Sequence, residues 1–199
     1  MPHLRPDLSS PAPEPLTDLF GPGIRSVWLE IGFGGGEHLA WQAEHNPDTG
    51  IIGAEPFLNG QASLTSHIED RGLANVRIYD DGVQDLLAWL PPASVGRTFI
   101  LFPDPWPKKR HIKRRIVSPK TLTALARVMV PGAELRVATD IAEYVRTTML
   151  AVNSSPDFLW PALTPSDWRE RPAGWPPTRY EAKALAAGRK CQYFRFARR

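Results

Sequence analysis

The residues best suited to chemistry lie in one segment, where an aspartate stands between two prolines at the end of an apolar run. The run Thr98–Phe102 is followed by Pro103, Asp104 and Pro105. Each proline fixes its own φ angle and favours an extended conformation for the residue before it. We therefore expect Asp104 to be displayed on a rigid backbone at the end of a strand, which is typical of a residue that contacts a ligand.

A strongly basic run follows this aspartate directly. Six of the eight residues 108–115 are Lys or Arg, and His111 lies among them. Residues 1–104 carry 5 Lys or Arg against 14 Asp or Glu, whereas residues 105–199 carry 19 against 7. Cations beside a displayed carboxylate suit the phosphates of a nucleic acid. A solvated or nuclear-targeting basic run is the alternative, and attachment to a strand end disfavours it.

A second cluster is rich in glycine. The stretch 29–36 reads L-E-I-G-F-G-G-G, which predicts a strand that enters a tight turn and opens a helix. A dinucleotide-binding turn requires G-x-G-x-x-G, and this spacing is absent, so a nicotinamide-dependent oxidoreductase is disfavoured. The acid on the strand would suit a ligand bearing an ammonium group, such as the methionine part of S-adenosylmethionine. Either this turn binds no ligand, or its cofactor contacts are Glu30, Gly32, Gly34 and Gly36.

Two further acidic positions follow predicted strands. Glu55 ends the second strand, where doubly wound folds place a carboxylate that accepts hydrogen bonds from ribose hydroxyls. Asp80 and Asp81 end the third strand, and either could accept a hydrogen bond from an adenine amino group. Each acid alone is weak evidence, but three strand-end acids in order predict a nucleoside-containing cofactor.

The elements that must position these residues alternate between short apolar runs and helical stretches. This alternation predicts an α/β fold with a mostly parallel, doubly wound sheet. The apolar alternation of Tyr193–Phe196 predicts a final strand, expected to be antiparallel, and the Pro- and Trp-rich stretch 156–177 predicts a structured loop. The expected strands and helices are 27–31, 37–45, 51–54, 58–71, 76–79, 83–90, 98–102, 119–129, 134–138 and 141–152.

Composition narrows the class of protein further. We expect a flexible N-terminal arm over residues 1–22 and a single domain over residues 23–199. No apolar stretch is long enough for a membrane span or a signal core, and Cys191 has no cysteine partner, so we expect a cytoplasmic protein. The five histidines show no ligand spacing, which predicts no metal site and surface or capping roles for these side chains.

Taken together, these motifs resemble the bacterial tRNA (guanine-N7-)-methyltransferases. The resemblance spreads over about 150 residues, in the family order. It is carried by residues 29–36, 53–55, 81, 102–115, 138–140 and 178–181.

The resemblance implies a Rossmann-like fold, S-adenosylmethionine as cofactor, and methylation of N7 of the variable-loop guanine conventionally numbered 46. By position, Glu30, Glu55, Asp81 and Asp104 would contact the cofactor, and Asp104 would also be the catalytic residue. The substrate contacts would be Lys108, Arg110, Lys113, Arg114, Arg115, Asp140, Thr178, Arg179, Tyr180 and Glu181. tRNA would be the partner, with no membrane, metal or protein partner required, as a monomer or homodimer.

The chemistry of N7 fits a displayed carboxylate that takes no proton. N7 of guanine has an in-plane lone pair and no hydrogen, so Asp104 would position the base by accepting from its N1–H and amino group. Asp140 could supply a second acceptor that discriminates guanine from adenine. A non-catalytic RNA-binding module, and a methyltransferase acting on an exocyclic amine, are the alternatives.

Overall fold

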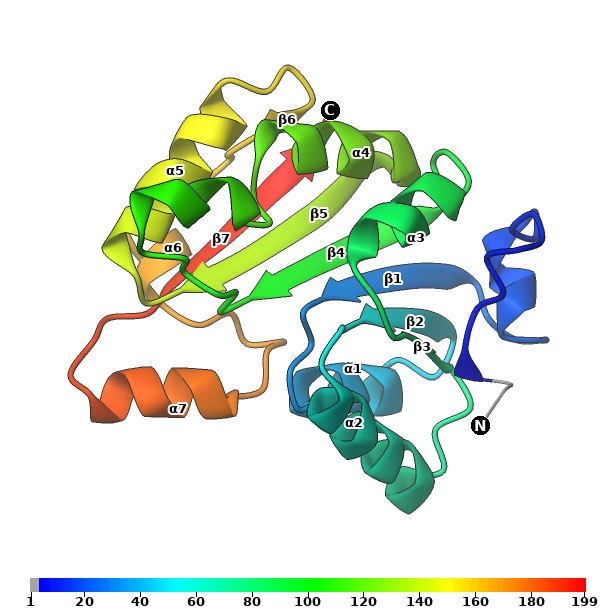
Figure 1. Ribbon diagram of the computed structural model, residues 1–199. Coiled ribbons are helices and arrows are strands. Elements are labelled where there is room, and N and C mark those ends of the chain that lie inside the picture. Colours follow the sequence, from blue (N-terminus) through cyan, green and yellow to red (C-terminus); the bar gives the residue numbers. More distant parts are fainter. Residues whose placement is uncertain (1–3) are drawn as a thin grey trace.

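The computed structural model describes residues 4–199, apart from the side chain of Lys109. One seven-stranded sheet forms the centre, with the strand order β3-β2-β1-β4-β5-β7-β6 (Figure 1). β1 to β5 pair in parallel, whereas β7 pairs antiparallel with β5 and β6. The predicted mostly parallel sheet with an antiparallel last strand is confirmed. The strands are β1 (Ser26–Ile31), β2 (Thr49–Ala54), β3 (Val76–Tyr79), β4 (Val95–Leu101), β5 (Met129–Thr139), β6 (Phe158–Leu159) and β7 (Gln192–Arg198).

Helices cover both faces of this sheet, as a doubly wound fold requires. α1 and α2 bury Leu39 and Leu64 on one face, while α3, α4 and α5 bury Leu86, Leu122 and Tyr144 on the other (Figure 1). Among residues 4–199, no helix has the length and apolar character needed to cross a bilayer. The helices are α1 (Glu37–His45), α2 (Leu58–Arg71), α3 (Val83–Trp89), α4 (Pro119–Val128), α5 (Ala142–Asn153), α6 (Ser166–Arg169) and α7 (Arg179–Ala186), with 3-10 turns η2 (Leu16–Leu19) and η3 (Lys109–Arg114).

The apolar runs of the sequence form strands that are buried on both faces. In β4, Phe99 and Ile100 point to opposite faces, and neither has exposed surface. In β7, Phe194 and Phe196 enter the larger core while Arg195 between them is exposed. The strand β4 is therefore an interior strand. The segment that follows it begins at the carboxyl end of the parallel strands, which is where ligands bind in such folds.

The stretch 156–177 is ordered by its tryptophans. It contains the short elements β6 and α6, and the rings of Trp160 and Trp168 pack edge to face with centroids 5.1 Å apart. Trp175 is buried and packs against Phe99 and Tyr193. The stretch covers part of the sheet and leads directly into α7.

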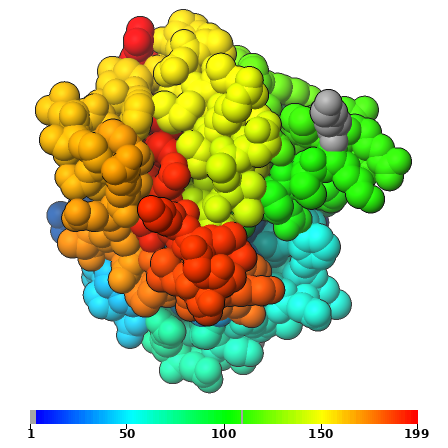
Figure 2. All heavy atoms as spheres, turned by 90° about the vertical axis from the view of Figure 1, so that its left-hand side faces the viewer, coloured from blue at the N-terminus to red at the C-terminus, as the bar shows by residue number. Residues whose placement is uncertain are grey.

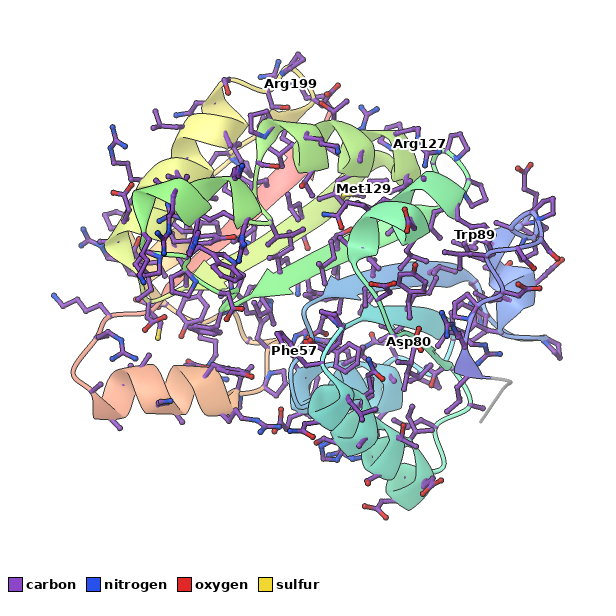
Figure 3. The ribbon with its side chains drawn as sticks, in the orientation of Figure 1. Phe57, Asp80, Trp89, Arg127, Met129 and Arg199 are labelled. Carbon is purple, nitrogen blue, oxygen red and sulfur yellow. The ribbon has the colours of Figure 1, made fainter. Side chains whose placement is uncertain are left out.

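Residues 4–22 pack on the domain, which differs from the flexible arm expected for residues 1–22. Leu4 and Leu16 are buried, and the indole of Trp89 donates a hydrogen bond of 2.7 Å to a carbonyl of this segment (Figure 3). The segment has no periodic pattern, so its apolar side chains gain partners only from the folded domain. The boundary at residue 22 stays a prediction.

The packing of Leu16 on the core is testable. Leu16→Ala should lower the free energy of unfolding by about 2–5 kcal/mol, because it removes a buried side chain and leaves a cavity. Leu163→Ala, at a residue that is 91% exposed, is the matched control and should change little. Urea unfolding of both variants gives the comparison, and equal stability of Leu16→Ala and the parent would mean that residues 4–22 do not pack.

Candidate active site

A pocket of about 290 Å³ opens where the carboxyl ends of β1, β2, β3 and β4 meet. Its position between β1 and β4, where the strand order reverses, is the usual ligand site of open α/β sheets. Figure 2 shows the side of the molecule on which α7 (orange-red), residues 100–116 (green) and α2 with its neighbours (cyan) converge. Of the residues predicted to form the site, the pocket brings together Gly32, Gly34, Glu55, Asp81, Asp104, Arg114 and Tyr180.

The glycine turn after β1 is covered by the start of α7. Gly34 has a φ of 55°, and a Cβ there would lie 2.8 Å from the ring of Tyr180. A Cβ on Gly35 would collide with the guanidinium of Arg179, which forms an ion pair of 2.7 Å with Glu37. Because Gly34 and Gly35 have no side chains, Arg179 and Tyr180 at the start of α7 can pack directly on this turn. The sequence analysis predicted these two residues as substrate contacts.

Two residues predicted as cofactor contacts do not line this pocket. A Cβ on Gly36 would lie 2.7 Å from the Cβ of Leu64, so this glycine serves the packing of α1 against α2. Glu30 is buried, and its carboxylate lies 2.7 Å from Nδ1 of His38. Glu30 therefore contacts a histidine, and its expected contact with the ammonium group of the cofactor stays a prediction. The expectation that the histidines are surface or capping residues was wrong for His38, which is buried.

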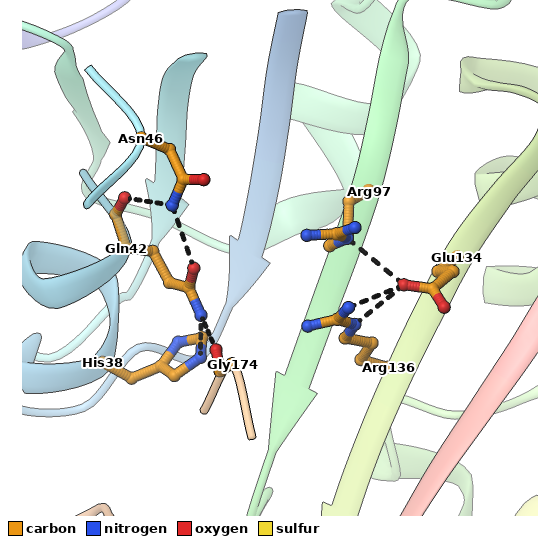
Figure 4. Close-up of polar contacts among 7 residues, drawn as sticks. All are labelled: His38, Gln42, Asn46, Arg97, Glu134, Arg136 and Gly174. Carbon is orange, nitrogen blue, oxygen red and sulfur yellow. Dashed lines mark hydrogen bonds and ion pairs between the residues drawn. The ribbon is translucent and has the colours of Figure 1, made fainter. Parts of the chain in front are cut away.

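His38 begins a buried polar chain that ties α1 to the segment before α7. Its Nε2 lies 3.1 Å from Nε2 of Gln42, which donates a hydrogen bond of 2.9 Å to the carbonyl of Gly174 (Figure 4). Asn46 extends the chain by donating to the carbonyl of Gln42 at 2.7 Å (Figure 4). These hydrogen bonds provide partners for the buried side chains of His38 and Gln42, and they fix the position of the backbone at Gly174, which leads to α7.

Glu55 is buried at the end of β2 and holds the walls of the pocket. Its Oε2 accepts from the backbone N–H of Gly34 at 3.0 Å, and its Oε1 accepts from that of Phe57 at 3.1 Å. A carboxylate oxygen has more than one acceptor site, so each oxygen can still accept from a ligand hydroxyl. The carboxylate therefore shapes the glycine turn and faces the pocket at the same time.

The structure separates the two adjacent aspartates that follow β3. Asp81 lines the pocket and accepts from the backbone N–H of Gly82 at 2.6 Å. Asp80 instead forms an ion pair of 2.9 Å with Arg5, on the side of β3 next to the N-terminal segment (Figure 3). Sequence alone left this choice open, because the partner of Asp80 lies 75 residues away.

The loop that carries Asp104 is bent by two strained residues. Phe102 has a φ of 48° and Trp106 a φ of 42°, a region that bulky side chains rarely adopt. Asp104 itself is exposed and lines the pocket. Such strain persists only where the surroundings impose it, and it is frequent at functional sites.

Arg115 holds part of this shape, and its side chain is buried rather than exposed as the predicted phosphate contact requires. The side chain is buried, and it donates to the carbonyl of Pro105 at 2.8 Å and to Oγ1 of Thr147 at 3.0 Å. It also lies over the ring of Tyr144, whose pKa is raised to about 12 by burial. A charge pattern could not show this, since it does not tell which arginine of a basic run turns inward.

Four other members of the basic run lie on the surface. Lys108, Arg110, Lys113 and Arg114 are exposed, and of these Arg114 lines the pocket. These four side chains form one cationic wall beside Asp104, and among the described side chains of Lys and Arg in the run only that of Arg115 is buried.

Asp140 and Glu181 lie near the site but are held by other side chains. Asp140 follows β5 and accepts from Nε of Arg189 at 2.5 Å. Glu181 is buried, forms an ion pair of 3.1 Å with Arg171, and accepts from the hydroxyl of Tyr193 at 2.5 Å. Burial, together with this hydrogen bond, raises the pKa of Tyr193, so the phenol remains a donor. Neither acid lines the pocket, and Thr178 caps α7 by accepting from the backbone N–H of Glu181.

Sequence reasoning missed the apolar lining of the pocket. Phe57, 67% exposed and labelled in Figure 3, belongs to this lining, as do Val83, Phe102 and Trp106. Phe102 and Trp106 belonged to the segment singled out for Asp104, and their positions flanking the two prolines were the available signal. Phe57 gave none, since a single aromatic residue after a strand is ordinary.

The fold and the pocket define a Rossmann-like methyltransferase. The sequence profile of a family described as a putative methyltransferase matches residues 24–193. The fold is shared with a solved 16S rRNA methyltransferase, KamB, at a TM-score of 0.59 and 18% identity, covering 95% of this chain and 94% of that one. It is also shared with an S-adenosylmethionine-dependent O-methyltransferase from Thermotoga maritima, at a TM-score of 0.56 and 16% identity, covering 88% and 60%.

The relatives define the family more narrowly. The tRNA (guanine-N(7)-)-methyltransferase of Chelativorans sp. is 50% identical over 100% of this chain and 85% of its own length. That of Rhodospirillum rubrum is 50% identical over 91% of this chain and 71% of its own length. The chain belongs to the tRNA (guanine-N7-)-methyltransferase family, and the resemblance found in the sequence is confirmed.

The inward position of Arg115 generates a prediction. Arg115→Ala should destabilise the protein by about 1–3 kcal/mol, because two partly buried acceptors lose their donor. It should also slow turnover by loosening the backbone next to Asp104. Lys113→Ala, an exposed neighbour, is the control and should leave the melting temperature unchanged. If Arg115→Ala has the melting temperature of the parent, the side chain of Arg115 is not held in the interior as described.

Proposed function

We propose that this chain methylates N7 of a guanine in tRNA, at the variable-loop position numbered 46, with S-adenosylmethionine as methyl donor. The observation that carries the proposal is the pocket itself, which brings a glycine turn and two strand-end carboxylates next to Asp104 and a cationic wall. A non-catalytic RNA-binding module would need the cationic wall alone. It would leave the strained loop of Asp104 without a purpose.

The residues of the pocket fit this methyl donor. Gly32 lines the pocket, and a Cβ there would meet no heavy atom within 4 Å, so the backbone can approach a ligand. Glu55 has acceptor capacity for ribose hydroxyls, and Asp81 for an adenine amino group. Phe57 and Val83 offer apolar surface to a base. When bound, S-adenosylmethionine supplies an electrophilic methyl group on a positively charged sulfur.

Asp104 performs the selection and alignment of the base. Its exposed carboxylate accepts from N1–H and the amino group of guanine, which adenine cannot offer in the same pattern. The N7 lone pair forms the new bond to carbon as the carbon–sulfur bond breaks, with its electron pair remaining on sulfur. No proton leaves N7, so the purine ring acquires the positive charge. A fixed carboxylate offsets that charge without taking a proton.

The cationic wall holds the RNA around this base. Lys108, Arg110, Lys113 and Arg114 are exposed on one segment, and their charges contact phosphates without reading sequence. Specificity comes from the shape of the tRNA and from an unstacked guanine that can enter the pocket. The reaction needs no metal and no protein partner, in a monomer or a homodimer, and takes place in the cytoplasm.

Product analysis tests the function directly. The protein, unmodified tRNA and labelled S-adenosylmethionine should yield 7-methylguanosine when the RNA is digested and analysed by nucleoside mass spectrometry. Asp104→Ala should lower the rate by about 100-fold or more, since the base is no longer aligned, and should leave the fold intact because Asp104 is exposed. Asp85→Ala, an exposed aspartate of α3, is the matched control. A methylated exocyclic amine as product, or normal turnover of Asp104→Ala, would contradict the proposal.

Glu55 gives a separate test of the cofactor site. Glu55→Ala should weaken binding of S-adenosylmethionine by about 1–3 kcal/mol, because ribose hydroxyls and two backbone N–H groups lose their acceptor. Binding of tRNA should persist, since the cationic wall is unchanged. Glu69→Ala, an exposed acid of α2, should bind the cofactor normally. Isothermal calorimetry measures all three proteins, and an unaltered affinity of Glu55→Ala would remove Glu55 from the cofactor site.

A further inference from the structure

The indole of Trp106 lies in the pocket two residues beyond Asp104, and the proposed alignment of guanine gives it no role. Its backbone is strained, with a φ of 42°, and its side chain lines the pocket together with Asp104 and Tyr180. A bulky residue is held in such a conformation only where the surroundings demand it. The surroundings therefore hold the indole in the pocket, where the target base would bind.

Two side chains of the basic run hold this indole. The guanidinium of Arg114 lies over the ring, 4.9 Å from its centroid, and the imidazole of His111 meets the indole edge to face at 5.7 Å. Within the described part of the chain, Arg114 forms no ion pair or hydrogen bond through its side chain, although it also lines the pocket. Its contact with the ring is a cation–π interaction that a better partner can displace.

The methylated guanine can replace Arg114 over the indole, because the reaction gives its purine ring a positive charge. Transfer of a methyl group to N7 leaves a positive charge on the guanine ring, and an indole face attracts cations more strongly than other aromatic faces do. A guanidinium that stayed over the same indole would repel that charge. Because Arg114 has no other partner among the described residues, it is free to move towards a phosphate of the RNA.

We propose that Trp106 stacks face to face on the target guanine, in the place that Arg114 occupies in the free protein, and that Arg114 transfers to an RNA phosphate. The indole then stabilises the positive charge that develops on the purine while Asp104 aligns its edge. In the free protein Arg114 covers the face of the indole. When Arg114 moves to an RNA phosphate, this face becomes available to the target base. This inference rests on the proposed function.

Binding of free nucleosides tests the stacking face, because nucleosides carry no phosphate for the cationic wall. We expect the full chain, loaded with S-adenosylhomocysteine, to bind 7-methylguanosine roughly 2- to 30-fold more tightly than guanosine, the range of a cation–π contact. Trp106→Leu should bring this ratio close to one, and Trp106→Phe should retain part of it. Trp41→Leu, which removes an indole of α1 stacked on His45, is the matched control and should keep the parent ratio.

Arg114 provides the more discriminating test, because its two expected effects have opposite signs. Arg114→Gln should bind 7-methylguanosine more tightly than the parent does, since the indole face is vacant, and should bind tRNA more weakly, since a phosphate contact is lost. Arg110→Gln changes an exposed arginine of the same run, so it should weaken tRNA binding without improving nucleoside binding. Titration by nuclear magnetic resonance and filter binding give the two affinities.

Kinetics separate this inference from the function on which it rests. With tRNA, Trp106→Leu should lower kcat more than it raises KM, and Trp106→Phe should restore part of kcat. A ratio of nucleoside affinities unchanged in Trp106→Leu, or weaker nucleoside binding by Arg114→Gln, would overturn the inference while the parent still forms 7-methylguanosine. If the parent forms no 7-methylguanosine in tRNA, the proposed function itself fails.

Discussion

The pairing of β1 with β2 on one side and β4 on the other is the constraint on which the site depends. The chain leaves β1 and β4 towards opposite faces of the sheet, so the turns that follow these strands separate and leave a pocket between them. The glycine turn and the loop of Asp104 are the two walls of this opening. The strands that carry these two walls, β1 and β4, have fully buried side chains at their centres, such as Leu29 and Phe99. Because the core around these strands is rigid, it fixes the distance between the groups that would bind the cofactor and the base.

Polar contacts, here called polar ties, hold the loops of the pocket rigidly against the sheet. His38 links Glu30 to α1, Glu55 holds the glycine turn through Gly34, and Arg115 holds the backbone at Pro105. Each tie satisfies a polar or charged group that would be costly to bury alone. The pocket therefore has its shape before a ligand arrives, which suits a reaction that depends on alignment rather than on proton transfer.

A second charged cluster shows that not every group of basic residues serves a ligand. Glu134 lies between Arg97 and Arg136 on neighbouring strands, at 3.4 and 2.8 Å (Figure 4). Burial alone would raise the pKa of Glu134, but the two arginines lower it. Arg136 also lies over the rings of Phe99 and Trp175, so this cluster joins β4, β5 and the segment before α7. Its one carboxylate pairs with both guanidinium groups within the fold, in contrast to the exposed run beside Asp104.

The sequence by itself determined the fold class, the family, and the turn, strand ends and loop that line the pocket, because apolar periodicity and glycine and proline positions act locally. It could not determine which members of a charged group line the pocket and which are buried or paired elsewhere. Asp81 rather than Asp80 lines the pocket, Arg115 turns inward while Arg114 does not, and Glu30 contacts His38. Tertiary structure decided these cases, because the partners of a charged side chain come from distant segments, and burial of a charge is settled only when those partners are in place.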